Sequence, residues 1–410
     1  MSPTDPFFCY LIGRLSSRAL VPVCAILIFL KVNDMICGLM KPLTESAIAL
    51  ARDQFAFEGI YVADRWIGSG RINDTRLVIT IGPTGHIYRY ILQRLNTDIF
   101  TKPLEVMENI AKVTEHLRKK CLERGGDPKR SVMALIPAKD GKPYWISPEG
   151  DFFRVTYFIT GAISYDEVDD PKVFEEAGRA FGEFQRDLSD FDGESLYETI
   201  PHFHDTLSRY ETFEKAVLED KAHRAKKVQD VIEEFRKHKQ IAVLFAQLQQ
   251  NGTLPIRVTH NDTKLNNVMI DEFSGKGLCV LDLDTVMPGL SCFDFGDAVR
   301  YGANKASEDE RDFSKVGIDL ELYEAFAKGF VSGLEGKLLP AEIDHLADGA
   351  MCMAFELGLR FLTDYLNGDV YFKASYPESN LDKAKVQLTL LKDMIAHEKE
   401  MRDIIEKLNR

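Results

Sequence analysis

Between residues 60 and 160, hydrophobic positions alternate with polar ones in short runs that glycine or proline turns separate. A repeat of two puts alternate side chains on one face of a strand, so this pattern predicts a β-sheet. Helical spacing occurs once before the first run and once after the third. The expected strands are 61–66, 76–80, 87–95, 132–137, 143–147 and 152–159, and the expected helices are 47–57 and 103–120.

The hydrophobic repeat lengthens to three or four residues in the rest of the chain, and this predicts helices. The clearest case runs from Val173 to Leu188, and the stretches 213–250 and 351–366 follow the same spacing. We therefore expect an α+β protein of two lobes. The smaller N-terminal lobe, 41–160, should contain an antiparallel sheet, and the larger C-terminal lobe, 161–410, should be mostly helical.

One polar loop interrupts the hydrophobic pattern of the larger lobe. It runs from Thr259 to Asn267, and the next apolar run ends in Asp282. The spacing His-x-Asp-x-x-x-x-Asn puts a carboxylate, Asp262, near a substrate hydroxyl and an amide oxygen, Asn267, near a cation. Asp282 would complete the few oxygen ligands that Mg²⁺ takes from a protein. The pattern predicts phosphoryl transfer from ATP, with Asp262 as the catalytic base and Asn267 and Asp282 as metal ligands.

Other interpretations of these acidic residues remain open. Asparagine and aspartate also cap ordinary turns, which is the usual explanation of a lone His-x-Asp pair. An Asp-Phe-Gly triplet that begins at Asp294 spells a kinase metal motif, but it follows a Met-Pro-Gly turn instead of closing the hairpin. We expect Asp294 and Asp297 to cap the helix at 295–301. Asp284 should contact either a second metal or only the loop.

Two glycines, Gly68 and Gly70, hinge the first predicted hairpin. Glycine lets backbone N–H groups approach phosphate oxygens closely, although two glycines alone also make an ordinary turn. The strand 87–95 should supply a group to the nucleotide phosphates, and either Gln93 or Arg94 must do so because adjacent strand residues face opposite sides. Arg94, the basic residue, is the candidate nucleotide ligand beside Gly68 and Gly70; a solvated Arg94 is the alternative.

The whole arrangement resembles the aminoglycoside phosphotransferase and choline kinase superfamily, small-molecule kinases that share the two-lobed protein-kinase fold. From about Gly59 to Arg402 the chain looks like N-acetylhexosamine 1-kinases. The segments that carry this likeness are 89–93, 176–182, 202–205, 257–267, 293–297 and 308–312. The resemblance implies ATP and Mg²⁺ as cofactors. It also implies phosphorylation of the anomeric hydroxyl of N-acetylglucosamine or N-acetylgalactosamine.

The resemblance bears on the substrate side as well. Glu356 and Arg360 lie one helical turn apart among apolar neighbours, and polar groups there need partners. Spacing alone favours an ion pair between them, whereas the resemblance implies that Arg360 and Tyr371 line the sugar pocket. Arg71 stands where the family has a histidine, so it is a substrate candidate that could instead meet a phosphate. We expect His260 to brace its loop and not to transfer protons.

Composition excludes several classes of protein. The formal net charge of −13 argues against a nucleic-acid partner, because phosphate backbones are held by clustered lysine and arginine. Seven cysteines occur without Cys-x-x-Cys spacing, which indicates a reducing compartment and no zinc site of that kind. We expect a cytoplasmic enzyme with a small-molecule substrate and without a membrane partner.

The first forty residues do not match the rest of the chain. Basic residues precede an apolar run from Leu20 to Leu30, which is about as long as a signal-peptide core and too short to span a bilayer. A secretory signal would carry an ATP-dependent enzyme to a place where ATP is scarce. We expect 1–40 to be a non-native or mis-assigned extension, with the true start at Met35 or Met40. A membrane anchor is the alternative.

These patterns lead to three hypotheses about function. The leading hypothesis is an N-acetylhexosamine 1-kinase. The second is another small-molecule kinase of the superfamily, acting on a different sugar, an amino alcohol or an aminoglycoside, since an acidic protein suits a cationic substrate. The third is a pseudokinase that binds nucleotide as a scaffold. Pseudokinases typically lose a catalytic aspartate or a metal ligand, and Asp262, Asn267 and Asp282 are all present.

Overall fold

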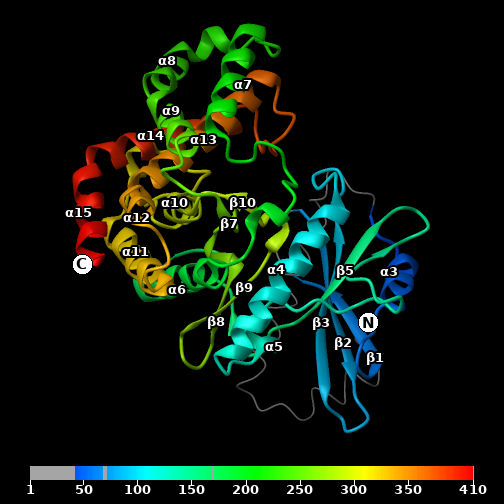
Figure 1. The fold of residues 1–410 in the computed structure, drawn as a ribbon. Helices are drawn as coiled ribbons and strands as arrows, with labels where there is room; N and C mark the ends of the chain where they lie inside the picture. The colour runs from blue at the N-terminus through cyan, green and yellow to red at the C-terminus, as the bar shows by residue number, and fades with distance from the viewer. Residues whose placement is uncertain (1–41, 68–71, 169, 410) are drawn as a thin grey trace, which may run out of the picture.

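A computed structural model describes residues 42–67, 72–168 and 170–409. Five antiparallel strands form the sheet of the N-terminal lobe in the order β1-β2-β3-β5-β4 (Figure 1). The expected strand 132–137 is wrong: the segment makes one isolated bridge to β5 at Leu135, and Pro137 has no N–H with which to extend the ladder. The strands are β1 (Ile60–Trp66), β2 (Asp74–Ile81), β3 (Ile87–Leu95), β4 (Trp145–Ile146) and β5 (Phe152–Tyr157).

Helices cover both faces of this sheet. The helix α3 (Glu45–Arg52) lies on the outer face, and α4 (Pro103–Glu123) lies between the sheet and the C-terminal lobe (Figure 1). Tyr90 and Leu92 of β3 belong to the core with α3, whereas Leu95 belongs to the core with α4. Since side chains alternate along a strand, even-numbered residues of β3 face α3 and odd-numbered ones face the α4 side.

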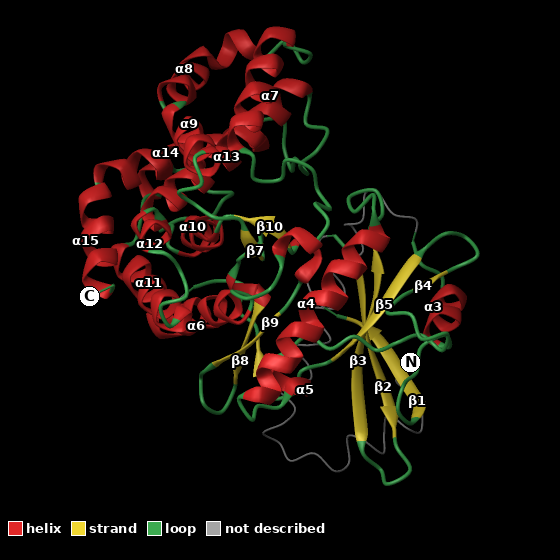
Figure 2. Cartoon of the chain, viewed as in Figure 1, coloured by secondary structure: helices red, strands yellow, loops and turns green. Residues whose placement is uncertain are grey.

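Helices make up most of the larger lobe (Figure 2), which confirms the predicted α+β architecture. Two small sheets lie at its junction with the smaller lobe. They are β6 (Ala162–Ile163), β8 (Val268–Asp271) and β9 (Gly277–Val280) in one, and β7 (Arg257–Thr259) and β10 (Met287–Gly289) in the other.

The helical stretch that we expected at 213–250 is divided among several helices. The helices of this lobe, with the short α5 of the smaller one, are α5 (Pro128–Ser131), α6 (Pro171–Asp187), α7 (Thr206–Glu219), α8 (Gln229–Lys237), α9 (Gln240–Gln250), α10 (Ser291–Gly302), α11 (Leu320–Leu334), α12 (Pro340–Asp344), α13 (Leu346–Asn367), α14 (Ser379–Ala396) and α15 (Glu398–Leu408).

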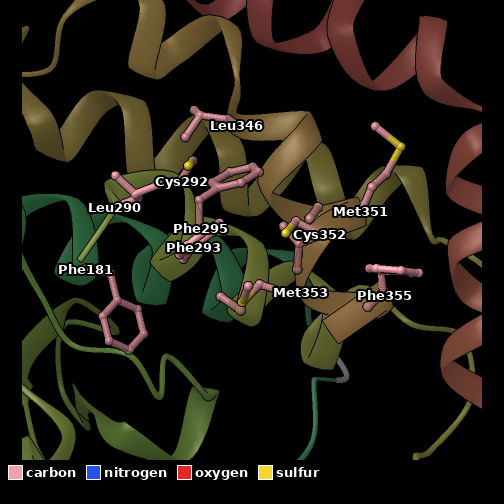
Figure 3. Packing of buried hydrophobic residues seen from close by; sticks show 14 of the residues in the cluster. Phe181, Leu290, Cys292, Phe293, Phe295, Leu346, Met351, Cys352, Met353 and Phe355 are labelled. Atoms are coloured by element: carbon pink, nitrogen blue, oxygen red, sulfur yellow. The ribbon is translucent and has the colours of Figure 1, made fainter. Parts of the chain in front are cut away.

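Helices α10 and α13 cross at very close range in the core of this lobe. A Cβ atom built on Gly296 of α10 would lie 2.3 Å from the carbonyl oxygen of Gly349 in α13. Glycine is needed there because any side chain would push the two backbones apart. Figure 3 shows apolar side chains of the two helices, among them Phe295 and Met353, packed around the crossing. The crossing fixes the relative position of two helices that carry residues of the site.

Within the described residues, none of the helices combines the length and the hydrophobicity that a membrane span needs. The extension that we expected at 1–40 lies outside the described residues.

Candidate active site

The 259–267 loop connects β7 to β8 and brings Asp262 and Asn267 together. The side-chain amide of Asn267 donates to the backbone oxygen of Asp262 at 2.8 Å and to its Oδ2 at 3.2 Å. Lys264 Nζ lies 2.7 Å from Asp262 Oδ1. Because the nitrogen of Asn267 faces Asp262, its Oδ1 is the atom that remains for a cation.

A backbone bond places the second predicted metal ligand near the first. The N–H of Leu281 donates to the carbonyl oxygen of Asn267 at 2.8 Å, and Asp282 is the next residue. Asp282 has a left-handed backbone, with φ at 56°, which is uncommon for a residue with a side chain. The structure therefore holds Asn267 and Asp282, the two residues that the sequence predicts as metal ligands, on adjoining segments.

Asp282 is exposed by its accessible surface, yet many protein atoms surround its carboxylate. This desolvation, together with the charges of Asp284 and Asp262, raises its pKa to about 7. Crowded carboxylates of this kind favour a bound cation, which offsets their repulsion. Oxygen-only donors fit Mg²⁺.

No group of three or more His, Cys, Asp or Glu side chains in the described ranges is arranged to hold a metal by itself.

His260 braces the loop, as expected. Its ring is buried, Nε2 donates to the carbonyl oxygen of Leu281 at 2.8 Å, and Nδ1 accepts from the N–H of Asp262 at 3.2 Å. These two bonds need the neutral ring with its proton on Nε2. His260 thus links the segment that carries Asp262 to the segment that carries Asp282.

The expectation that Asp294 and Asp297 cap a helix is wrong. Both lie inside α10, and both bind the 259–267 loop. Asp294 accepts the backbone N–H groups of His260 at 2.9 Å and Asn261 at 2.8 Å, and Asp297 accepts that of Thr263 at 3.1 Å. Asn261 has φ at 64°, so Asp294 holds a strained backbone in place. With its oxygens taken by amides, Asp294 has the role of a loop anchor.

Asp284, for which a metal or a loop contact was open, instead contacts the N-terminal lobe. Both of its oxygens pair with the guanidinium of Arg154 on β5, and Oδ2 also accepts from Asn73 Nδ2 at 2.8 Å. Sequence reasoning missed Arg154 and Asn73. Arg154 occupies an ordinary position in an alternating strand, so no local signal marks it.

The nucleotide candidates fall in three places. Gly68, Gly70 and also Arg71 lie outside the described residues. Arg94 is buried on the α3 side of the sheet, where Asp74 and Asp151 hold its guanidinium. Gln93 faces the opposite side and accepts from Arg154 Nε at 2.9 Å. Of the two alternatives on β3, this placement favours Gln93 as the residue nearer to the lobe junction.

Near the proposed acceptor residues, Glu356 and Arg360 do not form the ion pair that their spacing alone favours. Glu356 Oε1 lies 2.8 Å from His204 Nδ1, and Oε2 accepts from Thr206 Oγ1 at 2.6 Å. The guanidinium of Arg360 lies over the rings of Phe203 and Phe372, at 5.4 and 5.5 Å from their centroids. These segments are far apart in sequence, which is why helical spacing could not predict the pairing.

The second guanidinium of this region belongs to Arg209. Its Nη2 donates to the carbonyl oxygen of Phe203 at 3.2 Å, and its Nε is a buried atom without a hydrogen-bond partner among the described residues. Burial and the positive charge of Arg360 lower the pKa of Arg209. Two guanidinium groups therefore lie close enough to repel each other.

A buried carboxylate also orders the segment that carries Tyr371. Asp364 accepts the backbone N–H groups of Val370, Tyr371 and Phe372, each at 2.9 Å. The Tyr371 side chain is 66% exposed and meets the Phe372 ring edge-on. Since Phe372 also contacts Arg360, the two predicted substrate residues belong to one surface.

His204 connects this acceptor surface to the 259–267 loop. Its Nε2 lies 3.3 Å from the carbonyl oxygen of Asn261, the residue before Asp262. A cavity of about 270 Å³ lies beside the same two residues. Its lining includes neither Asp262 nor Arg360, so it is a neighbour of the acceptor surface and not its centre.

Comparison with known proteins supports a phosphotransferase. A model of the phosphotransferase enzyme family matches residues 65–325, a range that contains the 259–267 loop and Asp282.

Solved structures share the fold at low sequence identity. An aminoglycoside phosphotransferase from Alicyclobacillus acidocaldarius has 12% identity and a TM-score of 0.60, over 90% of this chain and 98% of that one. A microcompartment-associated aminopropanol kinase has 17% identity and a TM-score of 0.53, over 87% and 99%. An amicoumacin kinase in complex with AMP-PNP and Ca²⁺ has 14% identity and a TM-score of 0.50, over 88% and 94%. These likenesses establish the two-lobed kinase fold.

Proposed function

The chain belongs to the phosphotransferase enzyme family, and we propose that it is an ATP- and Mg²⁺-dependent kinase of N-acetylhexosamines. Its acceptor would be the anomeric hydroxyl of N-acetylglucosamine or N-acetylgalactosamine, and its product the sugar 1-phosphate. In this proposal the lobe 41–160 binds the nucleotide and the lobe 161–410 supplies the catalytic loop and the sugar site. The reaction belongs in the cytoplasm, where ATP is plentiful.

The chemistry assigned to this chain is mainly positioning. Asp262 orients the anomeric hydroxyl and accepts its proton as the sugar oxygen bonds to the γ-phosphorus and ADP leaves. The anomeric hydroxyl is more acidic than other sugar hydroxyls, which eases the transfer of its proton to a carboxylate. Asn267 and Asp282 would hold Mg²⁺, which neutralises charge on the phosphates when it is bound. His260, Asp294 and Asp297 keep the loop in shape.

The observation that carries the choice of substrate is the positive charge of the acceptor surface. Arg209 and Arg360 contribute two guanidinium groups. Burial alone would lower the pKa of His204, but the charge and hydrogen bond of Glu356 outweigh it and raise that pKa. Among the described residues, Glu356 is the carboxylate that contacts the ring directly, and both of its oxygens are taken.

A cationic acceptor would be repelled by this surface. A neutral sugar fits it better, because an acetamido oxygen and hydroxyl oxygens accept from guanidinium N–H groups. The exposed ring of Tyr371 and the neighbouring Phe372 offer apolar faces to a sugar ring. This charge argues against the amino alcohols and aminoglycosides named for the structural neighbours.

An acceptor panel tests the proposal. The purified chain is given ATP and Mg²⁺ with N-acetylglucosamine, N-acetylgalactosamine, glucose, galactose, choline, ethanolamine and an aminoglycoside, and ADP release is measured. We expect turnover with the two N-acetylhexosamines, and ³¹P NMR should assign the product as an anomeric phosphate. Preference for choline, ethanolamine or the aminoglycoside would contradict the proposal, and so would phosphorylation at another hydroxyl.

A further inference from the structure

Arg154 is enclosed at the junction of the two lobes, where it makes three polar contacts. It lies on β5 and is 1% exposed. Its Nη1 pairs with Asp284 Oδ1, its Nη2 donates to Asp284 Oδ2 at 3.0 Å, and its Nε donates to Gln93 Oε1 at 2.9 Å. A two-pronged contact of this kind fixes the plane of a carboxylate as well as its position.

Asn73 adds a third donor to the same carboxylate from the same lobe. Its Nδ2 reaches Asp284 Oδ2 at 2.8 Å, while its Oδ1 accepts the N–H of Asn96 at 3.0 Å. Arg154 and Asn73 both belong to the N-terminal lobe. In the 281–285 turn, both of them bind the carboxylate of Asp284.

Asp284 is two residues beyond Asp282, in a 3₁₀ turn that spans Leu283–Thr285. Asp282 itself has the left-handed backbone described above. Such a conformation persists only where its surroundings determine it. The 259–267 loop holds both ends of the turn, through the bonds of His260 and Asn267 to Leu281 and through the bonds of Thr285 to His260 and Asn261. Between these ends, the N-terminal lobe holds Asp284.

We propose that Arg154 is a positioning residue for phosphoryl transfer, which holds the turn that presents Asp282 to the nucleotide-bound metal and ties that turn to the N-terminal lobe. The inference rests on the proposed metal role of Asp282 but not on the identity of the acceptor. Arg154 lies on the same face of the described sheet as Gln93 of β3. It is the buried basic residue of that face that points toward this turn. It therefore acts on the metal site through Asp284.

Positioning and simple electrostatics predict opposite results for one substitution. Arg154→Met removes a positive charge near Asp282, so a purely electrostatic role predicts tighter Mg²⁺ binding. A positioning role predicts weaker binding, because the turn loses its anchor. Residues that orient metal ligands typically change affinity or activity by about 10–100-fold. We expect Mg²⁺-dependent binding of AMP-PNP to weaken by at least about 10-fold in Arg154→Lys and Arg154→Met.

Calorimetric titration of AMP-PNP at several Mg²⁺ concentrations measures this effect without any acceptor. Failure of the sugar assignment would leave the titration unaffected, so the two proposals fail separately. The matched control is Arg76→Lys. Arg76 is also a buried arginine of this sheet, 6% exposed and paired with Asp64, but it lies on the α3 side. We expect its Mg²⁺ dependence to stay within about twofold of the wild type, since it contacts no part of the turn.

Two further variants separate positioning from folding. Arg154→Met leaves Asp284 buried without its partner, which by itself lowers stability. The double variant Arg154→Met/Asp284→Leu removes both charges, so its melting temperature should recover. Its Mg²⁺-dependent binding of AMP-PNP should stay at least about 10-fold weaker than that of the wild type.

If the single variants do not fold, Asn73→Ala removes one hydrogen bond to Asp284 and should weaken the Mg²⁺-dependent binding of AMP-PNP by about threefold. Recovery of wild-type Mg²⁺ dependence in the double variant would overturn the proposal. Equal changes of Mg²⁺-dependent AMP-PNP binding in Arg154→Lys and Arg76→Lys would also overturn it, as would wild-type binding in Asn73→Ala.

Discussion

The two sides of the candidate site, one proposed for the metal and the other for the acceptor, carry opposite charge. Asp262, Asp282 and Asp284 crowd the proposed metal side, where burial and then the charges of Asp284 and Asp262 raise the pKa of Asp282 to about 7. Guanidinium groups dominate the acceptor side, where the pKa of Arg209 falls. A site divided in this way draws a cation to one half and disfavours a cationic acceptor at the other. The charges alone therefore assign the metal ion and the acceptor to different sides of the site, without any argument from shape.

The two sides are nevertheless built in the same way. On each, a buried carboxylate accepts backbone N–H groups and so holds a loop: Asp294 does so for the 259–267 loop, and Asp364 for the segment with Tyr371. The close crossing of α10 and α13 at Gly296 joins the two supports. Each loop therefore depends on a rigid helix, and the difference between the sides lies in the charges that the loops present.

The largest expected effect separates the metal ligand from the loop anchor. Asp282→Asn should abolish turnover and weaken Mg²⁺-dependent nucleotide binding, because an amide offers one oxygen and no charge to a hard cation. Asp294→Asn should lower stability by about 1–3 kcal/mol, the cost of an unsatisfied buried group, without a change in the Mg²⁺ requirement. Turnover as a function of Mg²⁺, with melting curves, measures both.

The opposite pattern would reverse these two assignments. It would consist of a raised Mg²⁺ requirement in Asp294→Asn together with retained activity in Asp282→Asn. The metal side would then be centred on α10 and not on the turn after β9.

A smaller loss is expected at the base. Asp262→Asn keeps the size of the side chain and its place beside Asn267 but cannot accept the proton, so kcat should fall by at least about 10²-fold. Mg²⁺-dependent nucleotide binding should change little, and AMP-PNP titration of the same variant provides that control. Near-normal turnover would rule out Asp262 as the base.

The sequence predicted which side chains lie together on the proposed metal side better than it did on the proposed acceptor side. Asp262, Asn267 and Asp282 lie within one short stretch, and their spacing follows from a loop between two strands, so a local pattern identifies them. The sequence did not decide whether Gln93 or Arg94 of β3 would bind phosphate. Alternation along a strand shows that the two residues face opposite sides, but it does not show which side faces the lobe junction.

The acceptor side comes from segments that only the tertiary fold brings together. Helical spacing paired Glu356 with Arg360, yet His204, more than a hundred residues earlier in the chain, takes that place. Arg154 was missed for the same reason, since its partner Asp284 is 130 residues away. The roles of Asp294 and Asp297 were misjudged because a carboxylate in the first turns of a helix usually binds that helix, whereas here it binds a loop.

On the acceptor side, loss of a guanidinium should reduce the discrimination against cations. Arg360→Gln keeps hydrogen-bond donors but removes the charge, so KM for N-acetylhexosamine should rise by about 10-fold, as for the loss of one charge-assisted hydrogen bond. Inhibition by choline should become stronger at the same time. Arg186→Gln is the control, because Arg186 is a helical arginine that pairs with Glu335 elsewhere in this lobe. Equal effects of the two variants would show that the charge of Arg360 does not select the acceptor.

The smallest expected effect is the pH dependence of His204. Its pKa is raised above the ordinary value near 6.5, so the stability that its protonated form contributes is complete below that value and is lost as pH rises through the folded-state pKa. The pKa of Glu356 is lowered: burial would raise it, but His204 outweighs this, so its contribution is lost only in acid. Two other charges also act on the pKa of the ring: Asp297 raises it and Arg360 lowers it. Between pH 6 and pH 9 the melting temperature of the wild type should fall by about 2 °C relative to His204→Gln. Inhibition by choline should strengthen over the same range as the acceptor side loses one positive charge. A wild type whose melting temperature follows that of His204→Gln at every pH would mean that the ring is neutral in the folded protein, and that the charge of the acceptor side comes from its arginines alone.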